Sequence, residues 1–257
     1  MRRIAIVSAM HQELAALLAA IPDEAPRLRA GRKFWIGHLD GHEVVAVLSG
    51  VGKVAAAATA TLLAGEFGVE RAIFTGTAGG LHPEARVGDV VVADALLQHD
   101  MDASPLFPRH EVPLYGTDRF ATDPDLSAAL AAAARGELDR ATGGDAGGGD
   151  ASGLDEAALR AFAITAPAVH TGLVVSGDRF VSTDTECRAL RTALPQALAV
   201  EMEGAAVAQV CHDFGVPFAA VRTISDRADD EAHVDFARFV REVASRHSAA
   251  IVLALLA

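Results

Sequence analysis

The chain has 257 residues, of which 51% are hydrophobic and 22% are charged, and its formal net charge is −12 at pH 7. This length suits one large α/β domain or two small ones, with enough apolar material for a buried core. The negative charge excludes a nucleic-acid backbone as partner, because phosphate binding needs a basic face.

The apolar runs are too short to cross a membrane. The longest, residues 249–257, falls far below the roughly 20 residues that a spanning helix needs. Near the start, the apolar run ends at Ser8 and Glu13 follows soon after, which leaves no adequate signal-peptide core. The two cysteines have the spacing of neither a metal site nor a disulfide framework. We therefore expect a cytoplasmic protein that contacts no membrane.

Short apolar runs alternate with alanine-rich helical stretches, which indicates a layered α/β sheet. In chain order, the expected strands are 4–7, 44–48, 72–75, 90–93, 173–175 and 218–224. The expected helices are 12–20, 54–64, 154–163, 204–211 and one from about Phe236. Glycine turns are expected after two of the strands, at 49–52 and 76–80.

One segment cannot belong to a core. Residues 142–153 contain six glycines and no large apolar side chain. Such a composition cannot bury enough surface to offset chain entropy, so we expect a flexible insertion there. A domain linker is the alternative, but the pieces on either side do not look like complete sheets. We therefore treat 1–257 as a single domain.

Acidic side chains follow the ends of several expected strands, where ligands bind in open α/β sheets. Glu13 follows the first strand, residues 201–203 follow the apolar stretch 197–200, and Asp226 follows the last strand. Convergence of these ends would make one pocket with three or four carboxylates. On the residues alone, the sequence predicts an α/β enzyme with an acidic pocket.

Each of these groups has a structural alternative. Glu13 suits the first turn of a helix, where the helix dipole favours an acid. Asp226 suits a helix N-cap, Glu203 a helix start, and Glu201 a solvated strand end. The run 50–53 resembles a phosphate loop but lacks the length of that motif. Residues 99–102 contain possible metal ligands, but a loop-forming role is favoured because no further ligand motif accompanies them.

Six segments together carry a resemblance to a known family. They are SAM at 8–10 with Glu13 after it, SGVGKV at 49–54, TGTAGG at 75–80, SGDRFV at 176–181, AVEMEGAA at 199–206 and VRTISD at 221–226. In this combination the chain resembles the 5'-methylthioadenosine/S-adenosylhomocysteine nucleosidases, within the purine nucleoside phosphorylase and uridine phosphorylase superfamily. The resemblance implies a single-domain, three-layer α/β/α sandwich with a central mixed sheet.

The resemblance also implies a role for each matched residue. Asp226, supported by Ser225, would protonate adenine N7, and Glu13 would orient or activate the attacking water. Glu203 would bind the ribose hydroxyls. The other implied substrate contacts are Met202, Arg222 and Thr77 on the sugar and water side, Phe180 and the backbone of Val181 at the adenine, and Met10, Val51, Phe236 and Phe107 around the rest of the pocket.

These residue types suit N-glycosidic cleavage. A carboxylate near the ribose stabilises the oxocarbenium-like sugar, and an acid must protonate the leaving adenine. The resemblance implies a homodimeric hydrolase of methylthioadenosine or adenosylhomocysteine, acting in methionine salvage without metal or cofactor. The alternatives are a phosphorylase, a nucleosidase for futalosine, AMP or adenosine, and a non-catalytic nucleoside-binding protein. Phosphorylases place arginines around phosphate, and the region of Glu13 has none.

Three departures from the family pattern affect the substrate. Thr77 stands where the family commonly has serine. His11 and Gln12 stand where further acids are expected, so Glu13 is the lone carboxylate there. The segment 101–116 is longer than in the common bacterial form, and in the family this region helps to cover the 5' substituent, often from the neighbouring subunit. The resemblance therefore does not fix the 5' group.

Overall fold

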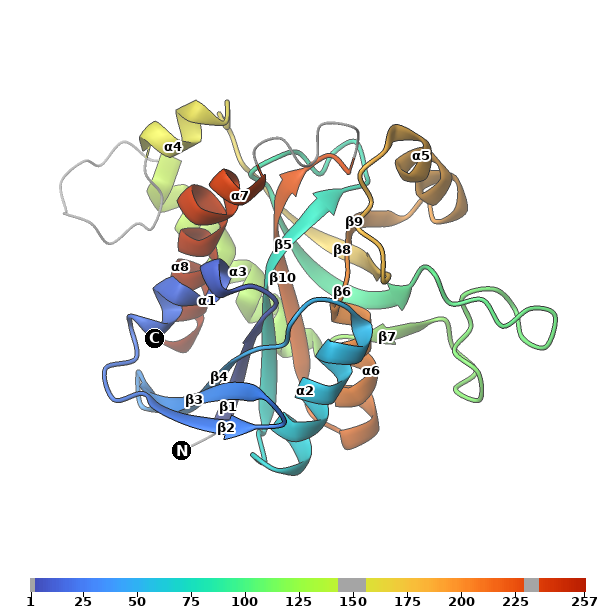
Figure 1. Cartoon of the computed structure of the whole chain (residues 1–257). Coiled ribbons are helices and arrows are strands. Elements are labelled where there is room, and N and C mark those ends of the chain that lie inside the picture. Colours follow the sequence, from blue (N-terminus) through green and yellow to red (C-terminus); the bar gives the residue numbers. More distant parts are fainter. Residues whose placement is uncertain (1–2, 143–155, 229–235) are drawn as a thin grey trace.

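The centre of the fold is a ten-stranded sheet, seen within residues 3–142, 156–228 and 236–257, which the computed structural model describes (Figure 1). In chain order the strands are β1 (Arg3–Ser8), β2 (Ala25–Arg29), β3 (Arg32–Leu39), β4 (His42–Leu48), β5 (Arg71–Gly80), β6 (Val90–Gln98), β7 (Arg119–Ala121), β8 (Val169–Ser176), β9 (Ala197–Glu201) and β10 (Phe218–Asp226). They lie in the order β10-β6-β8-β9-β5-β1-β4-β3-β2, with β7 on β6. Parallel pairs such as β1–β4 occur beside antiparallel pairs such as β3–β4, so the expected mixed sheet is confirmed.

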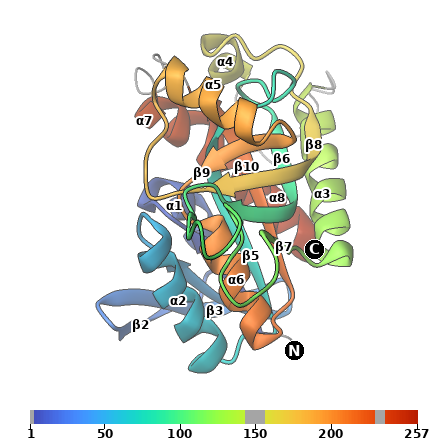
Figure 2. The same ribbon diagram turned by 90° about the vertical axis from the view of Figure 1, so that its right-hand side faces the viewer.

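Helices cover both faces of this sheet. They are α1 (His11–Leu18), α2 (Lys53–Gly65), α3 (Pro124–Thr142), α4 (Glu156–Ala161), α5 (Asp184–Ala193), α6 (Gly204–Phe214), α7 (Phe236–Phe239), the π-helical turn η1 (Val240–Ala244) and α8 (Ser245–Leu256). Helices α2 and α6 pack together on one side, and α8 packs with α1 and α3 on the other (Figures 1 and 2). The finer description as a single domain of three layers stays a prediction.

Strand β1 is buried on both faces because alternate residues enter two different cores. Ala5 and Val7 pack in the core beneath α2 and α6. Ile4 and Ile6 pack in the core beneath α1 and α8. Burial on both sides explains the continuous apolar run that predicts this strand.

At one end the sheet folds back on itself. Strand β5 pairs with β1, β9 and β10, and β10 also pairs with β6. Gly79 of β5 lies opposite both Val200 of β9 and Asp226 of β10. This closure brings the carboxyl ends of three strands to one place, where the acidic residues of the sequence motifs lie.

The end of β5 differs from the expectation. A glycine turn is predicted at 76–80, but the strand continues to the end of that run. The glycines instead allow close approach of carboxylates. A Cβ at Gly76 would lie 2.9 Å from Glu13 Oε1, and one at Gly79 would lie 2.9 Å from Asp226 Oδ1. Glycine thus keeps room for two site residues without ending the strand.

The sequence does not predict β2, β3, β7, α3 and α5. The predicted insertion at 142–153 lies outside the described residues except for Thr142, which ends α3. The segment 101–116 projects from the body on the right of Figure 1. Within the described ranges, the helices are all too short or too polar to cross a membrane.

Candidate active site

A cavity of about 370 Å³ opens where β5, β9 and β10 end. Residues that follow β1, β4 and β8 complete its wall. The lining residues are Ala9, Met10, Glu13, Val51, 74–79, 179–181, 200–203, Arg222, Ser225, Asp226 and Phe236. The structure therefore brings together every expected site residue except Phe107.

Phe107 lies in the projecting segment 101–116, which is described in full. Residues of this segment do not contribute to the cavity wall of their own chain. The contact expected of Phe107 is therefore not made within the chain and stays a prediction for a neighbouring subunit.

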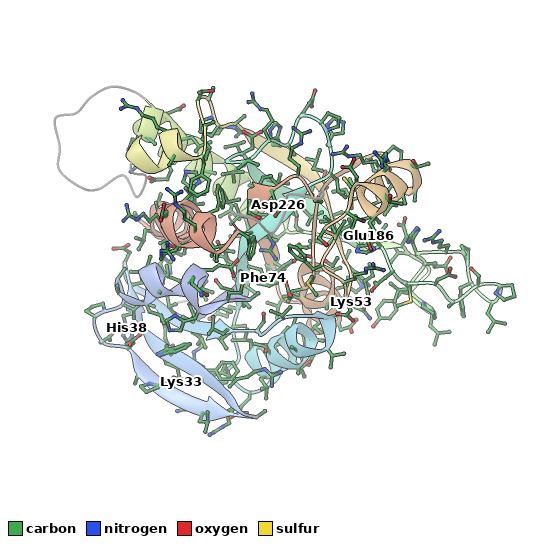
Figure 3. All side chains as sticks on the ribbon, turned by 45° about the horizontal axis from the view of Figure 1, so that its top comes forward. Lys33, His38, Lys53, Phe74, Glu186 and Asp226 are labelled. Carbon is green, nitrogen blue, oxygen red and sulfur yellow. The ribbon has the colours of Figure 1, made fainter. Side chains whose placement is uncertain are left out.

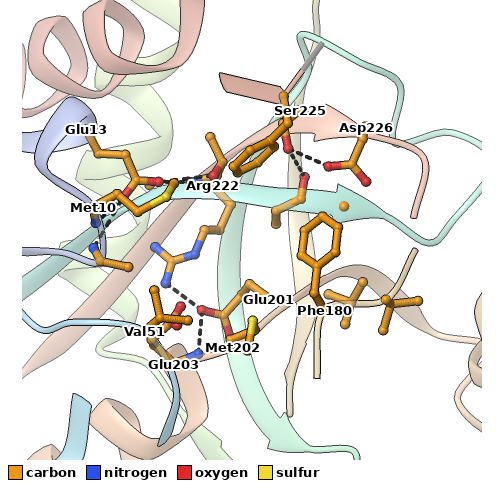
Figure 4. A pocket seen from close by; sticks show the side chains of 18 of the residues that line it. Met10, Glu13, Val51, Phe180, Glu201, Met202, Glu203, Arg222, Ser225 and Asp226 are labelled. Carbon is orange, nitrogen blue, oxygen red and sulfur yellow. Dashed lines mark hydrogen bonds and ion pairs between the residues drawn. The ribbon is translucent and has the colours of Figure 1, made fainter. Parts of the chain in front are cut away.

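The Glu13 carboxylate is buried at one wall of the cavity (Figure 4). Its Oε2 accepts hydrogen bonds from the backbone N–H groups of Ala9 and Met10, at 3.1 and 3.0 Å. Its Oε1 accepts hydrogen bonds from the backbone and hydroxyl of Thr77, both at 3.0 Å. Burial raises the pKa of Glu13 although these bonds and the charge of Arg222 oppose the shift. A raised pKa makes the carboxylate a stronger base, which suits the uptake of a proton.

Glu203 is the second buried carboxyl of the cavity and follows β9. Its Oε1 accepts a hydrogen bond of 2.7 Å from the backbone N–H of Gly52, which joins the turn after β4 to the site. Burial, followed by the charge of Glu201, raises the pKa of Glu203 to about 8, and the bond from Gly52 works against this shift. Glu203 is therefore an acid whose charge changes close to neutral pH.

Asp226 ends β10 and lies 8% exposed. The pairing of β10 with β5 shifts register between Ile224 and Asp226, a bulge of the kind that re-aims side chains at functional sites. The hydroxyl of Ser225 donates to Asp226 Oδ2 at 2.7 Å, and the N–H of Ala228 donates to Oδ1 at 2.8 Å (Figure 4). These bonds fix the orientation of the Asp226 carboxyl at the cavity.

The sequence leaves Glu201 as a possible solvated strand end, and that interpretation is wrong. In the structure Glu201 is a buried part of the site. Its carboxylate is buried and lies 2.8 Å from Nη2 of Arg222, which is 2% exposed (Figure 4). The Arg222 guanidinium also donates to the carbonyl of Phe74 and stacks 4.1 Å from that ring. The glutamate therefore compensates the buried arginine, and the sequence signal is its place inside the EMEGAA run.

Aromatic side chains form the rim of the cavity. Phe180 is 43% exposed and meets the ring of Phe236 edge to face, with the centroids 6.0 Å apart. Val181 beside it is buried. An exposed ring above a buried aliphatic residue suits a flat, apolar-faced ligand such as a nucleobase.

No three His, Cys, Asp or Glu side chains within the described ranges lie where they could share a metal ion. In the run 99–102, the Asp100 carboxylate accepts from Lys53, and Asp102 accepts from the hydroxyl of Ser104. The ring of His99 lies so close to Gly177 that a Cβ there would approach it to 2.3 Å. These contacts tie the run to neighbouring loops.

The fold and cavity together define an α/β enzyme site for a small molecule, with carboxyl groups and an aromatic rim. Comparison with known proteins identifies the family. The model of the phosphorylase superfamily matches residues 3–257, and the chain belongs to that superfamily.

Individual relatives agree with this assignment. The chain is 37% identical over 255 residues to the 5'-methylthioadenosine/S-adenosylhomocysteine nucleosidase of Geobacillus thermodenitrificans, covering 99% of this chain and 96% of the relative. The crystal structure of the same kind of nucleosidase from Neisseria meningitidis, in complex with methylthio-immucillin-A, matches with a TM-score of 0.82 and 33% identity over 99% and 98% of the two chains. The futalosine hydrolase of Helicobacter pylori matches with a TM-score of 0.80 and 29% identity over 99% and 97%. The resemblance seen in the sequence is confirmed.

Proposed function

We propose that the chain is an N-ribosyl hydrolase that cleaves 5'-methylthioadenosine, S-adenosylhomocysteine or both, and releases adenine with the 5'-thio-substituted ribose. The observation that carries this proposal is the arrangement of Glu13, Glu203 and Asp226 around one cavity, each held by hydrogen bonds from backbone N–H groups. The full-length similarity to nucleosidases supports the same substrate class.

The reaction assigns one proton transfer to each of two carboxyl groups. Asp226 donates a proton to adenine N7 while the bond between C1' and the base breaks. Water attacks C1', and its proton passes to Glu13, whose raised pKa suits a base. Glu203 binds the ribose hydroxyls, and its charged form stabilises the developing positive charge of the sugar.

The arginines of the cavity favour hydrolysis over phosphorolysis. A phosphate nucleophile normally requires arginines that are free to bind it. The arginines of the described cavity wall are Arg179 and Arg222, and each faces a carboxylate, Glu186 and Glu201 respectively. A phosphate would have to displace one of these partners and approach the Glu13 carboxylate as well.

A second candidate substrate is futalosine, because a futalosine hydrolase matches this chain over nearly its whole length. The difference between the candidates lies in the 5' group. The segment 101–116, which the resemblance places over that group, does not line the cavity of its own chain. The identity of the 5' substituent therefore depends on what closes the cavity.

We also propose a homodimer in which Phe107 of the segment 101–116 reaches the neighbouring cavity. Large apolar side chains are exposed on that segment and on the start of α2, namely Leu106, Leu114, Val51 and Val54. Exposed apolar groups of this size suit an interface. Sedimentation velocity should give the mass of a dimer. A cytoplasmic location, which the short apolar runs favour, and a role in methionine salvage, which the resemblance implies, remain predictions.

The proposed function is tested by incubation with methylthioadenosine, adenosylhomocysteine and futalosine in phosphate-free buffer, followed by chromatography of the products. We expect adenine and a free 5'-thio sugar. Glu13→Gln should lose this activity because an amide cannot accept the proton, whereas Glu84→Gln, an exposed residue outside the cavity, should keep it. If the protein releases no adenine until phosphate is added, and a ribose 1-phosphate then appears, the protein is a phosphorylase. Binding of the nucleosides without turnover would identify a non-catalytic binding protein.

A further inference from the structure

The start of helix α2 is held by carboxylates from distant parts of the chain. The N–H of Gly52, the N-cap, donates to Glu203, 151 positions away, and the N–H of Lys53 donates to Asp178 Oδ1 at 2.7 Å, 125 positions away. The first N–H groups of a helix have no partners inside it, and Gly52 has no side chain to supply one. The helix start is therefore coupled to the loops that carry the active site.

The side chain of Lys53 strengthens the same connection. Its ammonium lies 2.6 Å from Asp100 Oδ1 and 3.1 Å from Gln98 Oε1. The second oxygen of Asp100 accepts the N–H of Asp178 at 2.9 Å. Lys53, Asp100 and Asp178 thus form a closed group, the rim cluster, that joins three loops. Lys53, the first residue of α2, is labelled in Figure 3.

Helix stability alone does not explain Lys53. It is the first residue of α2, where the helix dipole disfavours a cation, and the first turn contains no acid to offset it. Gly52 has a φ of +94°, and a Cβ there would lie 3.1 Å from Asp178 Oδ1. This glycine-specific conformation directs its N–H at Glu203. The backbone of Gly52 and the side chain of Lys53 therefore both contact loops that carry the site.

We propose that the rim cluster is a set of positioning residues for the nucleoside. It fixes the Gly52 N–H on Glu203 and holds the loop that leads to Phe180. The Glu203 carboxylate at the sugar and the Phe180 ring at the base thereby keep a fixed position relative to each other. This inference rests on the proposed function. The hydrogen bonds described for Glu13 and Asp226 lead to residues outside the cluster, so loss of the cluster should weaken binding far more than the chemical step.

The test compares Lys53→Met with Lys53→Arg. Removal of a hydrogen bond to a charged group typically costs about tenfold or more in an equilibrium constant. We expect KM for methylthioadenosine to rise about tenfold in Lys53→Met, with kcat changed less than about threefold, and Lys53→Arg to restore most of the loss. The pH at which nucleoside affinity changes should also move upward, because Glu203 loses the bond that lowers its pKa. Unfolding should change by no more than about 1 kcal/mol, since the pair is still partly exposed to solvent.

The matched control is Asp118→Asn, which changes a partly exposed carboxylate that binds Arg119, outside both the cluster and the segment 101–116. It should behave as the wild type. A pH profile that stays in place in Lys53→Met, an equal fall in kcat with KM unchanged, or a failure of Lys53→Arg to rescue would overturn the proposal.

A second readout separates this proposal from the proposed function. The affinity of a 5'-methylthio C-nucleoside, which has no N-glycosidic bond to hydrolyse, is measured by calorimetry for the wild type and both variants of Lys53. Binding by a wild type that releases no adenine would refute the hydrolase while the affinities still decide the role of the cluster. If the wild type binds no nucleoside, the cluster has nothing to position and the proposal is refuted too.

Discussion

Glu201→Gln is a substitution in the active site for which the structure predicts a large loss of stability. Arg222 is almost completely buried, and Glu201 is the carboxylate in contact with it. The substitution keeps the size of the side chain but removes its charge. A buried guanidinium then loses the carboxylate paired with it, which is far more costly than the loss of an exposed ion pair.

The surroundings of Glu201 determine the magnitude. Four groups donate to its two oxygens: the Ser176 hydroxyl, the N–H groups of Glu203 and Gly204, and the Arg222 guanidinium. A glutamine amide would point its own N–H₂ at some of these donors. Removing one partner of a buried ion pair costs about 3–5 kcal/mol. For a chain of this size, each kcal/mol lowers Tm by about 2–4 °C, so a fall of about 6–20 °C is expected.

The assay is urea or thermal unfolding of Glu201→Gln beside a matched control. Glu43→Gln breaks the partly exposed pair between Glu43 and Arg3, and it should cost at most about 1 kcal/mol. Adding Arg222→Met to Glu201→Gln removes the uncompensated charge and should recover part of the loss. If Glu201→Gln costs no more than the control, the buried pair is not the stabilising contact inferred here.

Three further predictions concern the acid, the 5' side and a buried imidazole. Asp226→Asn keeps the shape of the side chain but cannot donate the proton, so kcat for adenine release should fall about 10²-fold or more with Tm preserved; retention of a tenth of the activity would remove Asp226 as the acid. Phe107→Ala should raise KM for methylthioadenosine more than for adenosine, since the lost contact is with the thioether, and equal effects would place Phe107 elsewhere. His247 is 1% exposed with neither ring nitrogen hydrogen-bonded, and burial lowers its pKa to about 4. Because the unfolded chain binds that proton from about pH 6.5 downward, stability should fall by up to about 1.4 kcal/mol per pH unit between 6.5 and 4. The His247→Phe variant should lack this share of the pH dependence in urea unfolding, and an identical slope would show that other groups produce it.

The strands that the sequence predicts are those with a simple burial pattern. β1 and β4 are buried on both faces and appear as continuous apolar runs. β2 has every residue exposed, so it presents neither an apolar run nor an alternation that could reveal it. Its place at the edge of the sheet follows from pairing with β3. The course of β5 through 76–80 could not be predicted either, because the glycines depend on carboxylates brought in from α1 and β10.

The acidic residues of the site were more predictable than the residues that hold them in place. Glu13 and Glu203 follow strands and Asp226 ends one, and open α/β sheets collect such residues at the carboxyl ends of their strands. Glu201 precedes the same helix as Glu203, and local sequence does not distinguish a buried acid from a solvated one. The difference arises from Arg222, which reaches Glu201 across the closed end of the sheet. Ion pairing of this kind is decided by tertiary structure.

Glu13 shows why the two interpretations of a site residue need not compete. As a first-turn acid it should cap α1, and its Oε2 does accept the N–H of Met10 at the helix start. As a catalytic residue it should face the cavity, and it does so with Oε1 bonded to Thr77. One oxygen anchors the carboxyl to a rigid element and the other reaches the site. The helix cap is thus the means by which the proposed base is held in place, and a substitution of Glu13 should affect both the stability of α1 and turnover.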